Sequence, residues 1–235
     1  MKHIVALSGG KDSTALALRL AEVEPREYEY VWTPTGDELP PMIEHWKRLE
    51  DRLGKSIRRI TAPVTLVQLT KEKHMLPNFR ARFCTPMLKI RPFQAYMLNN
   101  LPATAYVGLR ADEESRSGAD YGLDLYVTTR HPLREWGWGL SEVGAYLASC
   151  GVEIPPRTDC ARCFYQTLHE WYLLWRDYPN IYASAVDDED RTQHTYRSPQ
   201  RDTWPADLRG LSVRFKAGDI PTIRARGEGC RFCSL

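Results

Sequence analysis

Several features that mark other classes of protein are missing from this sequence. No run approaches the roughly 18 uninterrupted apolar residues that a membrane-spanning helix needs. Internal repeats and low-complexity tracts are also absent, which excludes a repeat protein. The net charge is only +2, with a pI of about 8.2, so the surface as a whole is not that of a polyanion-binding protein. We expect a soluble, cytoplasmic protein without a leader segment, in which any nucleic-acid contact is local.

The composition sets the size of the fold. A chain of 235 residues with 43% hydrophobic residues is long enough for one α/β domain with a sizeable core and an appendage. We place the α/β domain at residues 1–150. The remainder, 151–235, is expected to be a helical, cysteine-containing region packed on it.

The Walker spacing Gly-x-x-x-x-Gly-Lys-Ser/Thr is missing too, but a different glycine loop stands near the N-terminus. The stretch Ser8-Gly9-Gly10-Lys11-Asp12-Ser13 joins an apolar run to a helical pattern. Two glycines allow a sharp turn that brings backbone N–H groups close to an anion, at the partly positive start of a helix. Lys11 adds a positive charge for phosphate oxygens. This stretch predicts a phosphate-binding loop.

Strand and helix patterns alternate after this loop. Further strands are predicted at 28–33, 57–60, 105–109 and 123–128, and helices at 41–53, 87–98, 141–149 and 164–176. A β-α-β alternation with connections of this length implies a right-handed, mostly parallel sheet flanked by helices, of the Rossmann-like type. Ligands of such sheets bind outside the carboxyl ends of the strands. Thr35 and Gly36 follow the second strand, and Gly108, Arg110 and Glu114 follow a later one, so both loops are expected beside the first.

Four of the six cysteines form two C-x-x-C pairs, Cys160 with Cys163 and Cys230 with Cys233. In a cytosolic protein such pairs favour metal binding over disulfides. Four thiolates in two pairs can close one tetrahedral site, either a structural zinc site or a four-iron four-sulfur cluster. Such a site would tie the C-terminal appendage to the α/β domain.

Several blocks in a fixed order resemble a known family. They are SGGKDS at 8–13, Thr35-Gly36, Arg82-Phe83-Cys84-Thr85 with Leu88-Lys89, Gly108-x-Arg110 with Glu114-Ser115-x-Ser117, and His131-Pro132-Leu133-x-x-Trp136. Together they resemble the phosphoadenosine phosphosulfate (PAPS) reductase family, part of the adenine nucleotide α-hydrolase-like (HUP-type) superfamily. The first block is similar to the PP-loop of the ATP pyrophosphatases. The resemblance spans roughly residues 3 to 165.

Two departures from the true PAPS reductases favour an ATP-using branch of this family. The chain keeps Lys11, whereas the reductases have largely lost the lysine of this loop. Its tail, 229–235, pairs Cys230 with Cys233 and lacks the reductases' Glu-Cys-Gly-Leu-His motif. The combination resembles the four-cysteine thiolation branch, for example the enzymes of DNA phosphorothioation.

The resemblance therefore implies an enzyme that binds ATP with Mg²⁺, cleaves it to AMP and pyrophosphate, adenylates an acceptor and supports sulfur transfer. One alternative is a reductase of PAPS or of adenosine phosphosulfate (APS). Another is a nucleotide-binding regulator with a zinc-stabilised tail. Implied partners are a sulfur donor protein such as a cysteine desulfurase and a nucleic-acid acceptor.

The resemblance also implies roles for single residues. Loop 8–13 would hold the pyrophosphate, with Asp12 reaching Mg²⁺ through water, and Lys89 and Arg110 would neutralise charge at the α-phosphate. Iron-sulfur APS reductases have a C-x-x-C where Cys160 and Cys163 stand, which favours the cluster. Cys84 would then be a persulfide carrier or nucleophile, and its alternative role as a cluster ligand stays open.

Overall fold

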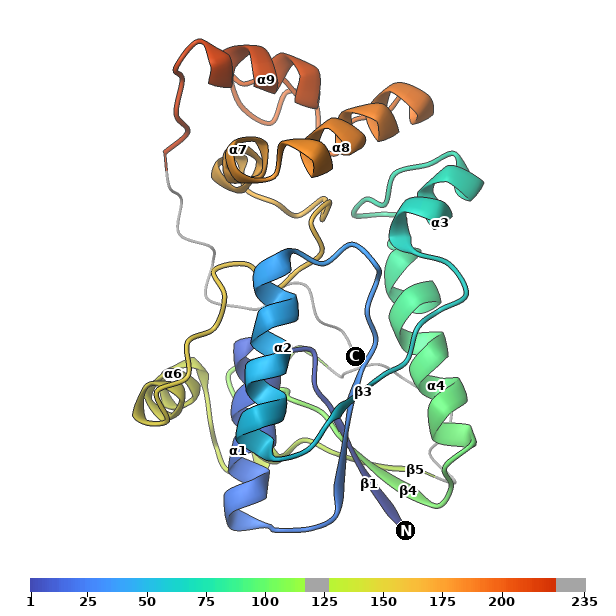
Figure 1. Cartoon of the computed structure of the whole chain (residues 1–235), viewed down its shortest axis with the longest axis vertical. Helices are drawn as coiled ribbons and strands as arrows, with labels where there is room; N and C mark the ends of the chain where they lie inside the picture. The colour runs from blue at the N-terminus through green and yellow to red at the C-terminus, as the bar shows by residue number, and fades with distance from the viewer. Residues whose placement is uncertain (117–126, 223–235) are drawn as a thin grey trace.

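The computed structural model describes residues 1–116 and 127–222. Within these residues the core is a five-stranded parallel sheet in the order β3-β2-β1-β4-β5 (Figure 1). The strands are β1 (Lys2–Ala6), β2 (Tyr28–Trp32), β3 (Ile57–Arg59), β4 (Ala103–Tyr106) and β5 (Val127–Arg130). This confirms the predicted parallel α/β fold.

Helices cover both faces of the sheet because the central strand is apolar on both sides. Val5 and Leu7 pack in a cluster with α1 (Lys11–Val23), α2 (Pro40–Leu53) and α6 (Leu140–Ser149). Ile4 and Ala6 point to the opposite face, where they pack with α4 (Arg91–Leu98). Such alternation with apolar residues on both sides is typical of a buried parallel strand. Figure 1 shows α1, α2 and α6 on one side and α4 on the other.

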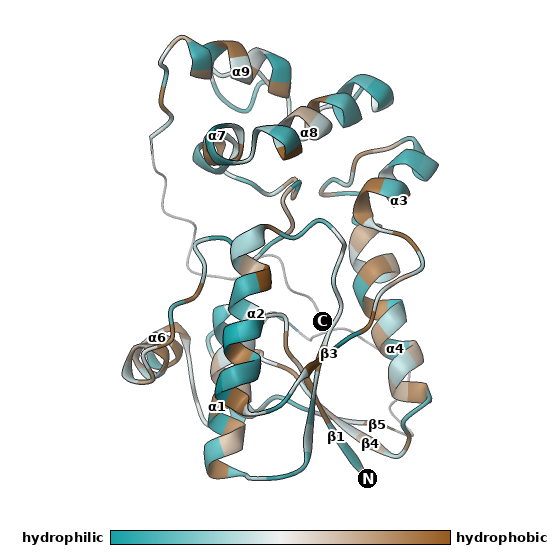
Figure 2. Ribbon diagram, in the orientation of Figure 1, coloured by the Kyte–Doolittle hydropathy of each residue, from teal (hydrophilic) through white to brown (hydrophobic). Residues whose placement is uncertain are grey.

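The covering helices are amphipathic. α2 and α4 each carry apolar and polar residues along their length (Figure 2). On α2 the buried residues include Met42, Trp46 and Leu49, at helical spacing, and Gly54 ends the helix in the left-handed conformation.

The C-terminal part is helical and has its own apolar cluster. It consists of α7 (Leu168–Asp177), α8 (Pro179–Thr192) and α9 (Leu208–Lys216), which lie together at one end of the molecule (Figure 1). The fully buried Trp171 lies in this cluster together with Tyr182 and Phe215. Leu39 and Leu76, from loops of the α/β part, join it, so the helices pack directly on that part.

Some boundaries differ from the sequence predictions. The predicted helix 87–98 is a π-helical turn, η1 (Pro86–Ile90), that continues into α4. The last predicted strand, 123–128, overlaps β5 at residues 127–128, and the rest of its range lies outside the described residues, as do Ser117, Cys230 and Cys233. The remaining short helices are α3 (Leu66–Lys73) and α5 (Pro132–Glu135). The domain boundary near residue 150 stays a prediction. No helix in the described ranges is long and apolar enough to cross a membrane.

Candidate functional site

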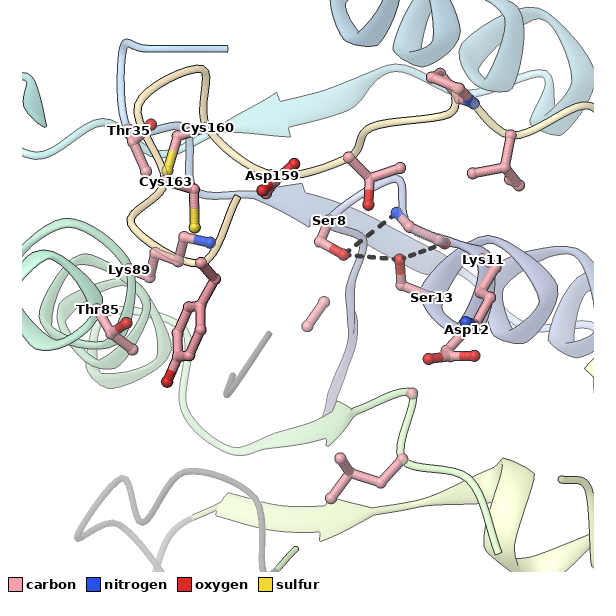
Figure 3. Close-up of a pocket in the computed structure, with 18 of the residues that line it drawn as sticks. Ser8, Lys11, Asp12, Ser13, Thr35, Thr85, Lys89, Asp159, Cys160 and Cys163 are labelled. Atoms are coloured by element: carbon pink, nitrogen blue, oxygen red, sulfur yellow. Dashed lines mark hydrogen bonds between the residues drawn. The ribbon is translucent and has the colours of Figure 1, made fainter. Parts of the chain in front are cut away.

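The glycine loop lies between β1 and α1, as predicted. Gly9 has a φ of +81°, and Gly10 forms the N-cap of α1. The hydroxyls of Ser8 and Ser13 are hydrogen-bonded at 3.0 Å, and Gly10 N–H donates to Ser8 Oγ at 3.4 Å (Figure 3). Ser13 Oγ donates to the Gly10 carbonyl at 3.1 Å. These bonds shape the loop around the start of α1, where the helix dipole favours an anion.

Gly9 is required by its surroundings. A Cβ at this position would lie 2.6 Å from Trp46 Nε1 and 3.0 Å from Met42 Cε, both on α2. Trp46 cannot give way easily, because it is buried and stacks on Trp32 with ring centroids 3.4 Å apart. The glycine loop is therefore packed against the stacked rings of Trp46 and Trp32.

Replacing Gly9 with alanine is expected to lower the free energy of unfolding by about 1–3 kcal/mol, through the positive φ and the contact with Trp46. Gly54→Ala is the matched control, since Gly54 also has a positive φ but has nothing within 4 Å of its Cβ position. We expect it to cost clearly less, about 1 kcal/mol. Urea denaturation measures both, and equal losses would show that the packing under Gly9 does not matter.

The second loop, after β2, is held by Glu38. Its Oε1 accepts hydrogen bonds from Thr35 N–H at 2.6 Å and Thr35 Oγ1 at 2.7 Å, and its Oε2 accepts one from Gly36 N–H at 3.0 Å. Gly36 has a φ of +76°, and a Cβ there would lie 2.6 Å from Thr65 Cγ2. Gly36 thus lets the loop approach the start of α3, which leaves Thr35 at the site.

The third loop, after β4, contacts the first. A Cβ on Gly108 would lie 3.1 Å from the Ser13 nitrogen, so any other residue would have to push the two loops apart by a few tenths of an ångström. Arg110 is 2% exposed, and its Nη1 lies 3.0 and 3.1 Å from the two carboxylate oxygens of Asp12. Its Nε donates to Asp112 at 2.8 Å. Arg110 thus holds the first turn of α1 in place through its ion pair with Asp12.

The cysteines form a wall on the other side of the site. Cys84 and Cys160 pack in one cluster with Leu66, Leu69 and Leu88. Burial raises the pKa of the Cys84 thiol, the neighbouring Cys160 raises it further, and the charge of Lys89 opposes the shift. A hydrogen bond with Cys160, together with burial, raises the pKa of Cys163 well above its usual value. The thiols of Cys84 and Cys163 are therefore protonated near neutral pH when no metal is bound.

Asp37, a residue that the sequence analysis did not single out, positions the C-x-x-C loop. Its backbone carbonyl accepts a hydrogen bond from Ala161 N–H at 2.6 Å, and its carboxylate accepts one from Arg162 N–H at 2.9 Å. The Arg162 side chain lies 3.3 Å from Asp37 and 2.9 Å from Asp188 of α8. Burial raises the pKa of Asp37 to about 6 although Arg162 opposes the shift. This buried network joins the loop after β2 to the C-terminal helices.

All these segments surround one cavity of about 370 Å³. That volume is within the usual range of small-molecule sites. Figure 3 shows Ser8, Lys11, Asp12 and Ser13 on one side, and Lys89, Cys160 and Cys163 on the other. The predicted site residues that line the cavity are Ser8, Gly10, Lys11, Asp12, Ser13, Thr35, Cys84, Lys89, Gly108, Cys160 and Cys163.

Other predicted residues do not reach the cavity. Gly9 and Gly36 shape their loops from behind, and Glu114 is exposed outside. Arg110 was expected at the α-phosphate, but its guanidinium is engaged by carboxylates behind the loop. Glu113, rather than Glu114, is the buried acid of this segment and pairs with Arg116 at 2.7 Å.

Several residues that line the cavity were not predicted from the sequence. They are Arg82, Arg116, Asp159, Pro155, Pro156, Thr158, Phe164 and Tyr165, among others. Arg82 and Arg116 stand inside blocks that the resemblance singled out, and Asp159 directly precedes Cys160. The sequence motifs therefore included or adjoined Arg82, Arg116 and Asp159, but they did not show that these side chains, rather than their neighbours, face the cavity.

The described residues fit the expected metals only in part. Cys160 and Cys163 supply two adjacent thiols, and the second pair lies outside the described residues. Within 1–116 and 127–222, no three metal-ligating side chains are grouped closely enough to hold an ion. The carboxylates at the cavity, Asp12 and Asp159, are paired with Arg110 and Arg157 respectively. The described residues thus provide two neighbouring thiols and no ready-made magnesium site.

The fold and cavity define a Rossmann-like α/β protein with a glycine loop between β1 and α1 that lines the cavity. Residues 2–156 match the family described as the phosphoadenosine phosphosulfate reductase domain. The chain belongs to this family, which confirms the resemblance read from its motifs. None of the curated proteins compared with the chain matches it.

Among solved structures, the chain is similar to the phosphoadenylyl-sulfate (PAPS) reductase from Candida auris, in a phosphate complex. The two are 15% identical, with a TM-score of 0.48. The match covers 66% of this chain and 75% of the Candida auris chain.

Proposed function

We propose that the chain binds ATP in this cavity and cleaves it between the α- and β-phosphates, so that AMP is transferred to an acceptor as pyrophosphate leaves. Sulfur from a donor then displaces the AMP from the acceptor. The observation that carries the proposal is the position of Lys11. It lines the cavity at the start of α1 and forms no ion pair with any residue in 1–116 or 127–222. Its charge is therefore available to phosphate oxygens, next to the N–H groups that begin the helix.

In this proposal the two sides of the cavity bind different phosphates of ATP. Loop 8–13 binds the β- and γ-phosphates, so that pyrophosphate is held as the leaving group. Lys89, on the opposite side, faces the α-phosphate and stabilises the charge that develops there. Arg110 keeps Asp12, and with it the first turn of α1, in place. Magnesium would supply further neutralisation of the phosphate charges.

Comparing the affinities for ATP and AMP tests this assignment. If the loop holds the β- and γ-phosphates, isothermal titration should give an affinity for ATP at least about tenfold higher than for AMP, equal to about 1.4 kcal/mol. Equal affinities for the two nucleotides would mean that the loop does not bind the pyrophosphate.

A second candidate function is the reduction of PAPS or APS. It is favoured by the family match and by the thiols that line the same cavity as the phosphate loop. Two neighbouring thiols, such as Cys160 and Cys163, supply the two electrons that release sulfite as they join in a disulfide. This reaction consumes no ATP, which separates it from the first candidate.

We further propose that Cys160 and Cys163 bind an iron-sulfur cluster together with Cys230 and Cys233, with structural zinc as the alternative. Cys84 then stays available to carry sulfur from a donor protein such as a cysteine desulfurase. Burial raises the pKa of the Cys84 thiol, and the charge of Lys89, which opposes this shift, would stabilise the thiolate that forms when Cys84 reacts.

Serine variants test the ligand set. Cys160→Ser and Cys230→Ser are expected to lose the metal, because three thiolates hold a cluster poorly. Cys84→Ser is the matched control and should retain it. The measurement is the absorption spectrum after anaerobic purification, with iron and zinc analysis. A colourless protein with one zinc would refute the cluster, and loss of metal in Cys84→Ser would make Cys84 a ligand.

A further inference from the structure

An exposed aromatic side chain stands beside the cavity. Phe79, in the loop after α3, is 56% exposed, whereas the other phenylalanines in the described ranges are buried or half-buried. Its ring contacts Phe164 and Tyr165 edge to face, with centroids 5.2 and 4.7 Å away. Both of these residues line the cavity. In Figure 1 the loop after α3 reaches towards the connection that precedes α7.

The loop that carries Phe79 is held in a defined turn. Asn78 Oδ1 accepts hydrogen bonds from the N–H groups of Arg80 and Ala81, both at 2.9 Å. The guanidinium of Arg82 lies 5.7 Å from the Tyr165 ring centre, and Arg82 lines the cavity. Phe79 is thus presented to solvent on a support of two rings, with arginines following it in the chain.

The segment of residues 73–111, which contains Phe79, carries charged side chains of positive sign only. Residues 73–111 contain no aspartate or glutamate, although the whole chain is nearly neutral. The same stretch carries Lys73, Arg80, Arg82, Lys89, Arg91 and Arg110. Lys73 and Arg80 are exposed, and neither pairs with an acid among the described residues. Arg82 and Lys89 continue the positive charge into the cavity.

An exposed ring flanked by positive charge matches the chemistry of an unpaired base and its phosphates. Bases stack on aromatic side chains, and each such contact contributes about 1–3 kcal/mol. A base inside a duplex is already stacked and paired, so only a single strand offers its face to one ring. Lysine and arginine neutralise the backbone phosphates.

We propose that Phe79 is a stacking platform for a base of single-stranded nucleic acid, whose phosphates contact Arg80 and Arg82 at the cavity rim. The strand would be the acceptor of the adenylation, and in that sense this inference rests on the proposed function. Binding of the strand, however, requires no ATP cleavage and can be measured separately.

Fluorescence anisotropy with the full chain tests the proposal. The probes are labelled oligothymidylate and oligouridylate of about 16 nucleotides, and a DNA duplex of the same length. We expect the single strands to bind more tightly than the duplex. Phe79→Ala should weaken binding about tenfold, and Phe79→Tyr should restore it. Val213→Ala, which removes another exposed apolar side chain, should change nothing.

The salt dependence tests the role of arginine independently. Between about 50 and 200 mM salt, Arg80→Gln should reduce the slope of log affinity against log salt by about one. The better of the two single strands identifies DNA or RNA as the source. Absence of single-strand binding, tighter duplex binding, or unchanged affinity in Phe79→Ala would each overturn the proposal. Strand binding without ATP cleavage would instead overturn only the proposed function.

Discussion

Replacing Lys11 with alanine is expected to lower the rate of ATP cleavage by about 10²–10³-fold, the typical effect of removing one preorganised group that stabilises developing charge. Lys11 is the cation at the start of α1 that lines the cavity. Pyrophosphate gains charge as it leaves, so an ammonium group beside it stabilises the transition state more than bound ATP. The variant should also bind ATP only about as tightly as AMP.

Two further variants separate this effect from a general loss of charge. Lys47→Ala removes an exposed lysine of α2 and should leave the rate unchanged. Lys11→Arg keeps the charge and should retain part of the activity, since arginine places its charge differently. The rate is measured as pyrophosphate release. Full activity in Lys11→Ala would place the reacting phosphates away from this loop.

Replacing Arg162 with methionine is expected to lower the free energy of unfolding by about 3–5 kcal/mol, the usual cost of removing one partner from a buried ion pair. Arg162 is 7% exposed and is the shared partner of Asp37 and Asp188. Methionine is similar in length but leaves both carboxylates buried without this charge. The connection between the loop after β2 and α8 should therefore be lost.

The pH dependence gives this prediction a second readout. Burial already raises the pKa of Asp37 to about 6 in the folded chain, against 3.8 in the unfolded chain. The folded chain therefore holds the proton of Asp37 more tightly than the unfolded chain does. The stabilisation that this gives is fully present below about pH 4 and is lost as the pH rises through about 6. Without Arg162 the pKa of Asp37 should rise further, so the variant should lose more stability at pH 8 than at pH 5.

Arg176→Met is the matched control, because Arg176 pairs with Asp177 on the surface of α7. Water and salt screen an exposed pair of this kind, so we expect almost no change in the free energy of unfolding. Chemical denaturation at the two pH values measures both variants. A similar small loss in Arg162→Met would mean that the buried network does not hold the C-x-x-C loop.

The sequence predicted which segments meet at the site, because strand ends in a parallel sheet share one edge. The sequence did not predict whether a given side chain in these loops points into the cavity or into the core. Arg110 follows a strand end, as a ligand residue does, but it pairs with Asp12, 98 positions earlier. Whether a guanidinium faces the cavity or the core depends on this distant carboxylate, which no local pattern encodes.

The same limit applies to Asp37 and to the cysteines. Asp37 looks like a turn residue in sequence, and its role depends on Arg162, 125 positions later. Cys84 and Cys160 are adjacent only because the loops after α3 and before α7 pack together. The position of the glycine loop between β1 and α1 was predictable because it depends on consecutive residues, Ser8 to Ser13, and on a local strand-to-helix turn.

In the proposed function, ATP is cleaved between its α- and β-phosphates at the loop of residues 8–13. The most direct test incubates the full chain with ATP and Mg²⁺, and separately with PAPS and a thiol reductant, each with single-stranded nucleic acid present. We expect one pyrophosphate for each ATP consumed, with the AMP either attached to the strand or free in solution, and no sulfite from PAPS. Sulfite release from PAPS, with ATP left intact, would contradict it.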